Sequence, residues 1–302
     1  MIIVKFQGGL GNQMFQYAFY KSLLFNYPKL KIKADISDYT INKYHQGFEL
    51  KKIFNINIEN ATKLDLFMSG KLSFFFIKKE KIRKILEKLY YFLYIILKKI
   101  NFTNYECIDY SYNSLVYEPT FFNLNTNKDY YLIGYWQNEL YFINIKNMII
   151  TDFYVPNSAY LHQLTDLINA SNSVSIHIRR GDYVNTGFDV LSIDYYKKSI
   201  ELIFLKIENP LFIIFSDDVE YVEKYFSYLN RKYIITENRG NNSYKDMLLM
   251  SLCKHNIISN STFSFWGAFL NKNLNKIIFA PNIFSTNTDL YLKCNGWNII
   301  EV

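Results

Sequence analysis

At 302 residues the chain is too long for one small hydrophobic core, and its formal net charge of +7 gives it an excess of basic side chains. Hydrophobic residues make up 50% and charged residues 20% of the sequence, a balance that excludes an intrinsically disordered protein. We therefore expect a folded protein of two domains. Its positive charge fits three kinds of partner: nucleic acid, an anionic membrane surface, or an anionic small molecule.

The placement of the lysines narrows these options. Most are scattered, whereas nucleic-acid-binding proteins usually carry a basic stripe or a recognisable module. The clearest basic cluster runs from Lys78 to Lys88, with Lys98 and Lys99 after it. The apolar run 89–97 between them is far shorter than the ~20 residues of a membrane span. This run fits an amphipathic helix on a membrane surface or a buried helix with lysines at its ends, and we favour the buried helix.

The cysteines and the first residues indicate the cellular compartment. Cys107, Cys253 and Cys294 are odd in number and have no metal-like spacing, which predicts reduced thiols in a cytoplasmic protein. Residues 1–6 are typical of a strand and not of a signal peptide, since neither a charged leader region nor a cleavage site follows.

The first half of the chain opens with a β-loop-α-β pattern. The apolar run 2–6 predicts a buried strand that enters a glycine-rich loop, and the helical spacing from Asn12 predicts a helix up to Asn26. Residues 31–35 alternate like a strand. The stretch 41–100 is expected to be mainly helical and loop, and residues 130–136 form a further candidate strand.

The second half repeats a strand-then-helix rhythm. The expected strands are 174–178, 211–215, 233–236, 256–259 and 276–280, and the expected helices are 193–207, a segment from Asp218 through Tyr228, and 244–253. Strands that alternate with helices predict a parallel sheet covered on both faces. Pro156 interrupts the pattern between Asp152 and Asn157, so we expect two α/β domains, 1–153 and 154–302. Two such Rossmann-like domains facing a cleft are the GT-B layout.

The most informative motif is Ser175–Tyr183, which contains His-Ile-Arg-Arg-Gly-Asp. It stands where a parallel strand gives way to its loop, the edge at which α/β proteins bind ligands. The planar guanidinium groups of Arg179 and Arg180 suit a diphosphate. Asp182 can orient an arginine or act as a base. A solvated loop with an internal salt bridge is the structural alternative, and His177 by itself is more often a core histidine.

Two further motifs follow later strands. In Phe215–Asp218, a carboxylate can accept hydrogen bonds from guanine or ribose, although either aspartate fits a helix N-cap equally well. The segment Ser259–Ala268 places several hydroxyl groups and free N–H groups at a helix N-terminus, which favours an anion site over simple capping. The chain contains no Asp-x-Asp and no His/Cys cluster, so no metal ion is expected.

The glycine-rich loop Gln7–Gln13 is a weaker motif. It is not a dinucleotide fingerprint, because Met14 stands where the last glycine of Gly-x-Gly-x-x-Gly is required. We interpret it as a turn beside a ligand, with Gly9 and Gly11 in the loop and Asn12 as a hydrogen-bonding group.

Together these segments resemble glycosyltransferase family 11, the α-1,2-fucosyltransferases of bacterial polysaccharide synthesis. The segments that carry the resemblance are 8–18, Gly134–Gln137, His177–Tyr183, Asp246–Asn256 and Asn260–Ser264. The His-x-Arg core is shared with α-1,6- and protein O-fucosyltransferases, so it indicates the donor but not the linkage. Phe265 departs from the tryptophan more usual in the family, but it keeps an aromatic ring.

The resemblance implies a GT-B fold, GDP-β-L-fucose as the donor, inversion at the anomeric carbon and no metal or other cofactor. Arg179, with Arg180 beside it, would grip the β-phosphate, and His177 and Asp217 would contact the guanosine. The α-helix start with Ser261, Thr262, Phe263 and Ser264 would bind the diphosphate. Asn12 and its glycine loop would lie near the fucose and the acceptor, in an acceptor-side N-terminal domain.

The expected mechanism is a displacement through an oxocarbenium-like transition state, in which Arg179 and the hydroxyl groups neutralise the charge on the leaving GDP. Asp182 is our first candidate for the base that takes the acceptor's proton, and Asp189 is the second. The acceptor expected from the family is a β-galactose terminus of a glycan, such as an O-antigen or polysaccharide repeat unit. Its binding loops would lie within 39–130.

Alternatives remain at this stage. One is a fucosyltransferase of another linkage, another is a sugar-nucleotide-binding module without activity, and a third is a basic nucleic-acid-binding protein. We expect no nucleic acid as a partner. Peripheral contact of a cytoplasmic protein with the inner membrane is a hypothesis that rests on the +7 charge. The sequence does not indicate the oligomeric state.

Overall fold

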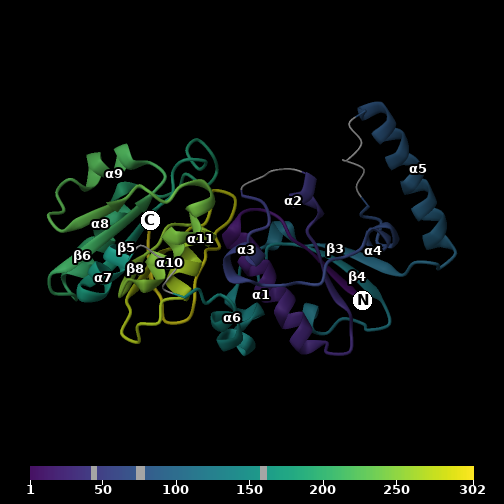
Figure 1. Cartoon of the computed structure of the whole chain (residues 1–302), viewed down its shortest axis with the longest axis horizontal. Coiled ribbons are helices and arrows are strands. Elements are labelled where there is room, and N and C mark those ends of the chain that lie inside the picture. The colour runs from purple at the N-terminus through teal and green to yellow at the C-terminus, as the bar shows by residue number, and fades with distance from the viewer. Residues whose placement is uncertain (42–45, 73–78, 157–161) are drawn as a thin grey trace. The chain divides into compact units, whose positions relative to one another are not determined.

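The computed structural model describes residues 1–41, 46–72, 79–156 and 162–302. Lys78, at the start of the basic cluster, and Asn157, at the end of the expected boundary, lie outside these ranges. The chain forms two compact units (Figure 1). The first consists of Met1–Trp136 with Leu140–Lys146, and the second of Gln137–Glu139 with Asn147–Val302.

The first unit is built on a parallel sheet of four strands in the order β2-β1-β4-β3. Its strands are β1 (Ile2–Lys5), β2 (Ile32–Asp35), β3 (Tyr105–Asp109) and β4 (Asp129–Ile133). Ile2 is paired with Ile32 on one side and with Tyr130 on the other. The expected strands 2–6, 31–35 and 130–136 are therefore confirmed, whereas β3 was not predicted. Its Tyr-Glu-Cys-Ile-Asp sequence is largely exposed and lacks the apolar run of a central strand.

The helices of this unit differ in how deeply they are buried. Helix α1 (Leu10–Asn26) buries most of its residues, and its Phe19 stacks on Trp136 at 4.2 Å between ring centroids. The others are α2 (Ser37–Ile41), α3 (Leu50–Phe54), α4 (Lys63–Met68) and α5 (Glu80–Lys99), with short 3₁₀ turns at Ser111–Asn113, Pro119–Phe122, Glu139–Tyr141 and Ile143–Ile145. The first residue of the third turn, Glu139, belongs to the second unit. Helix α1 packs against strands β1 and β2 of the sheet, whereas α5 leaves most of its residues exposed.

The interpretation of residues 89–97 as a buried helix was wrong. These residues belong to α5, in which Tyr90 is the buried side chain and Leu89 and Phe92 are 60% and 65% exposed. The apolar residues of α5 recur every three or four positions with lysines between them, which makes the helix amphipathic. The continuous apolar sequence 89–97 did not reveal this amphipathic character, because neighbouring residues on a helix point in different directions.

The second unit contains a parallel sheet of six strands in the order β10-β9-β8-β5-β6-β7. Its strands are β5 (Asn172–Ile178), β6 (Pro210–Ser216), β7 (Lys232–Ile235), β8 (His255–Ile257), β9 (Ile278–Pro281) and β10 (Asn298–Ile300). Its helices are α6 (Lys146–Asp152), whose first residue belongs to the other unit, α7 (His162–Ala170), α8 (Ile193–Phe204), α9 (Val219–Phe226), α10 (Tyr244–Leu252) and α11 (Thr262–Phe269), with a 3₁₀ turn at Gly240–Asn242. All five strands expected here are confirmed, and β10 is an addition.

Both faces of this second sheet are covered. In β6, Phe212 and Ile214 face one core with α8 and α9, and Ile213 and Phe215 face another with α7 and α10. Alternate residues of a strand point to opposite faces, so a strand buried on both sides reads as a continuous apolar run. The predicted α/β fold class, with a parallel, Rossmann-like sheet in each of the two units, is confirmed.

The strand order of the second unit reverses at β5. From there the chain runs outward through β6 and β7 on one side, and through β8, β9 and β10 on the other. The loops that leave β5 and β8 therefore diverge at their carboxyl ends, and such a switch point is where open α/β sheets bind ligands. The motifs that contain Arg179 and Ser261 both begin at this point.

Candidate functional site

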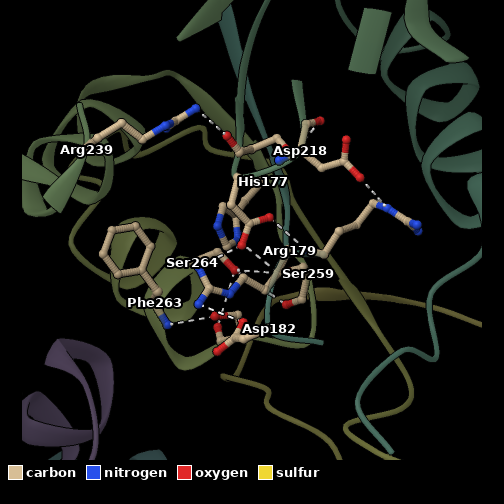
Figure 2. Close-up of polar contacts among 12 residues, drawn as sticks. His177, Arg179, Asp182, Asp218, Arg239, Ser259, Phe263 and Ser264 are labelled. Carbon is tan, nitrogen blue, oxygen red and sulfur yellow. Dashed lines mark hydrogen bonds and ion pairs between the residues drawn. The ribbon is translucent and has the colours of Figure 1, made fainter. Parts of the chain in front are cut away.

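His177 lies at the carboxyl end of β5, on the floor of the candidate site. Its Nδ1 is 2.9 Å from Ser259 Oγ, and its ring is 5.7 Å from the ring of Phe263 (Figure 2). Burial, aided by the charge of Arg179, lowers the pKa of His177 to about 3. The imidazole is therefore neutral at physiological pH and can offer one N–H donor and one acceptor.

Arg179, two residues further on, is clamped by two carboxylates. Its Nη2 is 2.8 Å from Asp182 Oδ1, and its Nη1 is 3.0 Å from Asp217 Oδ2. Burial acts against the charge on this guanidinium, but Asp217 and Asp182 outweigh it and raise the pKa of Arg179. Its positive charge is therefore permanent, and the fork is held in one orientation at the end of the strand (Figure 2).

The two carboxylates differ in how firmly they are held. The pKa of Asp217 is lowered, because Arg179, the backbone amides of Arg180 and Gly181, and His177 together outweigh the effect of burial. The amide of Arg180 donates to Asp217 Oδ1 at 2.9 Å. The side chain of Asp182, by contrast, is 55% exposed. An incoming anion can thus displace Asp182 from Arg179 more readily than Asp217.

Gly181 permits this close arrangement. A Cβ atom at this position would lie 2.8 Å from Asp217 Oδ2, closer than real contacts allow. Any larger residue would push away the carboxylate that holds Arg179. Glycine is therefore required here because there is no room for a side chain.

Arg180 is turned to a different partner. Its Nε donates to Asp218 Oδ2 at 3.0 Å, and its guanidinium lies over the Tyr221 ring at 4.1 Å. Asp218 also accepts from the amide of Tyr221 at 2.9 Å as the N-cap of α9. The N-cap interpretation is thus correct for Asp218, whereas Asp217 points to Arg179. The two adjacent arginines have separate environments.

Serine side chains are supplied by the loop after β8 and the start of α11. Ser261 caps this helix by accepting from the amide of Phe263, and Ser264 Oγ is 3.3 Å from Ser259 Oγ. The chain His177–Ser259–Ser264 thereby joins the end of β5 to the first turn of α11 (Figure 2). Thr262 is the first residue of the helix, where free N–H groups and the helix dipole favour an anion.

Two side chains near these motifs were not predicted. Ser259 was quoted in its motif but not as a site residue, although its position at the end of a strand was a usable signal. Arg239 follows β7, and its Nη2 donates to the carbonyl oxygen of Ser216 at 3.0 Å (Figure 2). Within the described residues Arg239 takes part in no ion pair. Only the sheet topology brings it to this edge, so no local pattern could have found it.

Asp189 lies near the arginines but outside their ion pairs. It is exposed and helps to line a small surface pocket with Arg179, Arg180, Tyr221 and Asn260. Asn260 donates to the carbonyl oxygens of Phe188 at 3.0 Å and Phe284 at 2.8 Å, which fixes the loop that carries Asp189. The role of Asp182 or Asp189 as a base stays a prediction.

The remaining predicted site residues, Gly9, Gly11 and Asn12, belong to the first unit. Gly9 is the N-cap of α1, and Gly11 and Asn12 lie in its first turn. Gly8, just before them, has a φ of +81°, and a Cβ atom there would be 2.7 Å from Asn12 Nδ2. The loop is therefore a tight glycine turn, as the sequence predicts.

Uncharged groups hold this glycine loop in place. Gln13 Nε2 donates to the carbonyl oxygens of Gly8 at 3.1 Å and Gly47 at 2.9 Å, and its Oε1 accepts from the amide of Glu49. The hydroxyl of Tyr39 donates to Gly8 at 2.8 Å. The side chain of Glu49 is buried here, and burial raises its pKa to about 7.

Among the residues that the structure describes, no group of three or more His, Cys, Asp or Glu side chains is arranged so that it could hold a metal ion. The described helices also include none long and apolar enough to cross a membrane.

Comparisons with known proteins identify the family. The chain matches the model of Glycosyl transferase family 11 over residues 1–301. It is 34% identical to an Escherichia coli alpha-1,2-colitosyltransferase, covering 93% of this chain and 91% of that protein. It is also 32% identical to the Escherichia coli O-antigen biosynthesis glycosyltransferase WbnK, covering 96% and 97%.

Among solved structures, the NodZ alpha-1,6-fucosyltransferase co-crystallized with GDP is similar at a TM-score of 0.48 and 10% identity, covering 88% of this chain and 91% of that one. This is a distant likeness. The family model, in contrast, matches nearly the whole chain, with the Arg179 and Ser261 motifs inside the matched range. The chain therefore belongs to glycosyltransferase family 11.

Proposed function

We propose that this glycosyltransferase moves L-fucose from GDP-β-L-fucose to the 2-hydroxyl of a terminal β-galactose, with inversion and without a metal ion. The observation that carries the proposal is the position of Arg179 at the switch point of the second sheet, opposite the hydroxyl-rich start of α11. A fixed cation, free backbone amides and serine hydroxyls are the groups that stabilise a leaving diphosphate.

Donor binding would exchange one partner of Arg179. The β-phosphate would replace the exposed Asp182 at Nη2, while Asp217 keeps Nη1 in place. The hydroxyl groups of Ser261 and Thr262 and the amide of Ser264 would take the other phosphate oxygens. Because the guanidinium is already oriented, little reorganisation is needed as charge develops on the leaving GDP.

The guanosine would lie toward His177, Phe263 and Arg239. The neutral His177 offers hydrogen bonds without a charge, and Phe263 offers a ring for stacking. Arg239 can present two N–H groups to O6 and N7 of guanine, the acceptor pair that arginine recognises best. Asp217 is a weaker candidate for guanosine than the sequence suggested, because Arg179 and Arg180 already use its oxygens.

Transfer would then proceed by displacement through an oxocarbenium-like transition state. Arg179 acts as an electrostatic group and not as an acid, since it stays charged throughout. The acceptor's proton needs a base, for which Asp182, once released from Arg179, and Asp189 are the candidates. Asp182→Asn should lower turnover by ~10²-fold or more if Asp182 is that base. A loss of only about tenfold would remove it from the role.

The deciding experiment is turnover of GDP-fucose with lactose in EDTA, comparing the wild-type enzyme with Arg179→Ala. We expect fucosylated product from the wild type and a loss of ~10²–10³-fold in the variant. Arg231→Ala, an exposed arginine that donates to the carbonyl oxygen of Asn209, is the matched control and should leave turnover unchanged. Failure of the wild type to bind GDP would refute the proposal, and α-1,6 or O-linked product would refute its linkage.

A second donor is favoured by one relative. The 34% identical Escherichia coli protein is named an alpha-1,2-colitosyltransferase, so GDP-colitose is the alternative donor. Both donors share the GDP moiety, and the Arg179 site does not distinguish them. Competition between the two nucleotide sugars in one assay gives the ratio of kcat/KM values, and a preference for colitose would replace fucose in the proposal.

The cellular role follows from the same relatives. We propose that the acceptor is an O-antigen or polysaccharide repeat unit and that the enzyme works in the cytoplasm. The family assignment favours this role over the nucleic-acid-binding alternative. Structural analysis of the surface glycan in a deletion strain, which should lack its α-1,2-linked fucose or colitose, tests the role in the cell.

A further inference from the structure

Helix α5 carries an exposed apolar stripe. The stripe consists of Ile82, Ile85, Leu89, Phe92, Leu93 and Ile96, each of which is at least 38% exposed. These positions are spaced three or four residues apart, with one adjacent pair, and so lie on one side of the helix. Single exposed apolar residues are ordinary, but a continuous row of six marks a contact surface.

The helix is attached to the first unit by a different side. The hydroxyl of Tyr90 donates to the carbonyl oxygen of Phe67 at 2.9 Å and accepts from the amide of Leu72 at 3.2 Å. The Tyr94 ring lies directly against Gly70, where a Cβ atom would be 2.7 Å away. At 100° per residue, these tyrosines lie about 130° around the helix from the middle of the stripe. The described contacts thus hold α5 by its tyrosine side and leave the stripe exposed.

Lysines border the stripe. Lys81, Lys84, Lys88 and Lys99 are exposed and occupy the side between the stripe and the glutamates of the helix. Lys84 pairs with Glu80 at 2.7 Å, and Arg83 with Glu87 at 3.9 Å. Over the described ranges no ion pair engages Lys81, Lys88, Lys98 or Lys99. Three of these four lysines, Lys81, Lys88 and Lys99, therefore place free positive charge next to the apolar stripe.

We propose that α5 binds the enzyme to an anionic phospholipid bilayer by lying in the plane of the interface. The stripe would enter the boundary between headgroups and acyl chains, and the bordering lysines would meet lipid phosphates, as in interfacial amphipathic helices. A purely apolar protein partner would match the stripe but not the unpaired lysines beside it. This inference does not depend on which sugar the enzyme transfers. It names α5 as the membrane-binding element, which the net charge of the protein could not identify.

The test is co-sedimentation of the full-length protein with vesicles of phosphatidylcholine alone and vesicles that also contain phosphatidylglycerol. We expect binding to the anionic vesicles and much weaker binding to the neutral ones. Raising the salt to 1 M shortens the Debye length to about 3 Å and should release much of the bound protein. The double variant Leu89→Ser/Phe92→Ser should weaken binding by about tenfold or more, since each side chain loses its burial in lipid.

Matched variants separate this role from general effects. Lys81→Ser/Lys88→Ser should lose the preference for anionic vesicles, while Lys197→Ser/Lys198→Ser, an exposed lysine pair on α8, should not. Leu205→Ser, a leucine that is 82% exposed, is the control for the apolar substitutions. Thermal melting and GDP binding should be the same in every variant, which shows that each one is folded.

The results of these experiments distinguish a lipid bilayer from a second copy of the protein as the partner of the stripe. No binding to either vesicle, or equal and salt-independent binding to both, would overturn the proposal. A wild-type protein that self-associates without lipid, and becomes monomeric in Leu89→Ser/Phe92→Ser, would assign the stripe to contact between two copies. Unchanged vesicle binding in that variant would place the membrane contact elsewhere on the molecule.

Discussion

The loops after β1 and β5 occupy equivalent places in their sheets, since each follows the strand at which the strand order reverses. They are held together by opposite kinds of groups. The loop after β5 is charged, and its two arginines are paired with Asp182, Asp217 and Asp218. The loop after β1 is uncharged and relies on Gln13 and Tyr39.

The difference in charge between the two loops indicates what kind of ligand each can bind. The loop after β5 holds half-buried arginines in ion pairs with aspartates. Such a site suits an anionic ligand that replaces one aspartate at an arginine, such as a diphosphate. Amides and glycines suit a neutral ligand rich in hydroxyl groups, for which a fixed charge would bring only a desolvation cost. The same strand-loop-helix frame is thus compatible with two chemistries.

The largest expected effect concerns the charged loop. Arg179→Lys keeps the charge but cannot hold Asp217 and a phosphate with a planar fork. We expect turnover to fall by ~10²-fold while GDP binding falls less, because the lost contact is strongest as charge develops on the leaving group. Steady-state kinetics with GDP-fucose measure this. Near-normal turnover would mean that a positive charge at position 179 is sufficient for catalysis and that the planar guanidinium geometry has no role.

The uncharged loop should be most sensitive at Gly8. Gly8→Ala places a side chain at positive φ and drives its Cβ against Asn12, so we expect a loss of about 2 kcal/mol in the free energy of unfolding. Gly47→Ala has the same positive φ with no atom within 4 Å, and is the matched control for backbone strain alone. Denaturant unfolding of both variants tests this, and equal losses would show that contact with Asn12 is unimportant.

The buried Glu49 beside the uncharged loop should make the stability of the first unit depend on pH. The folded-state pKa of Glu49 is raised from 4.5 to about 7 by burial, so its contribution to stability is present below pH 4.5 and is lost as the pH rises through about 7. Glu49→Gln, which does not titrate, should gain about 2 kcal/mol relative to the wild type between pH 5 and pH 8.5. Melting curves at the two pH values measure the difference. A gain that is the same at both would assign it to packing instead of charge.

The smallest expected effect is at His177, where the sign is reversed. Its folded-state pKa is lowered from 6.5 to about 3, so its contribution to stability is present above pH 6.5 and is lost as the pH falls toward 3. Between pH 7 and 8.5 the imidazole should not titrate at all. Imidazole ¹⁵N chemical shifts recorded from pH 5 to 8.5 should stay those of a neutral ring, and a titration near 6.5 would show that His177 is solvated.

The sequence predicted the regular parts of both sheets well. Central strands such as 174–178 are buried on both faces and appear as uninterrupted apolar runs, whose meaning is independent of their surroundings. The edge strand β3 was missed, because an exposed strand needs no apolar residues and forms only when a neighbour offers hydrogen bonds. The edge strand β10 was missed because its three residues, Asn298–Ile300, are too short a run to stand out in the sequence. Helix α5 was found but given the wrong environment, since its burial depends on what packs against it.

The sequence by itself determined the family, the α/β fold class and the three motifs that meet at the candidate site, because each of these is carried by local order along the chain. Only the tertiary structure decided which carboxylate belongs to which arginine and that Arg239 joins the site from β7. The same holds for the outward stripe of α5 and the buried Glu49. The physical reason is that pairing, burial and pKa depend on distances across the sheet, which the folded arrangement of strands sets and the order of residues does not display.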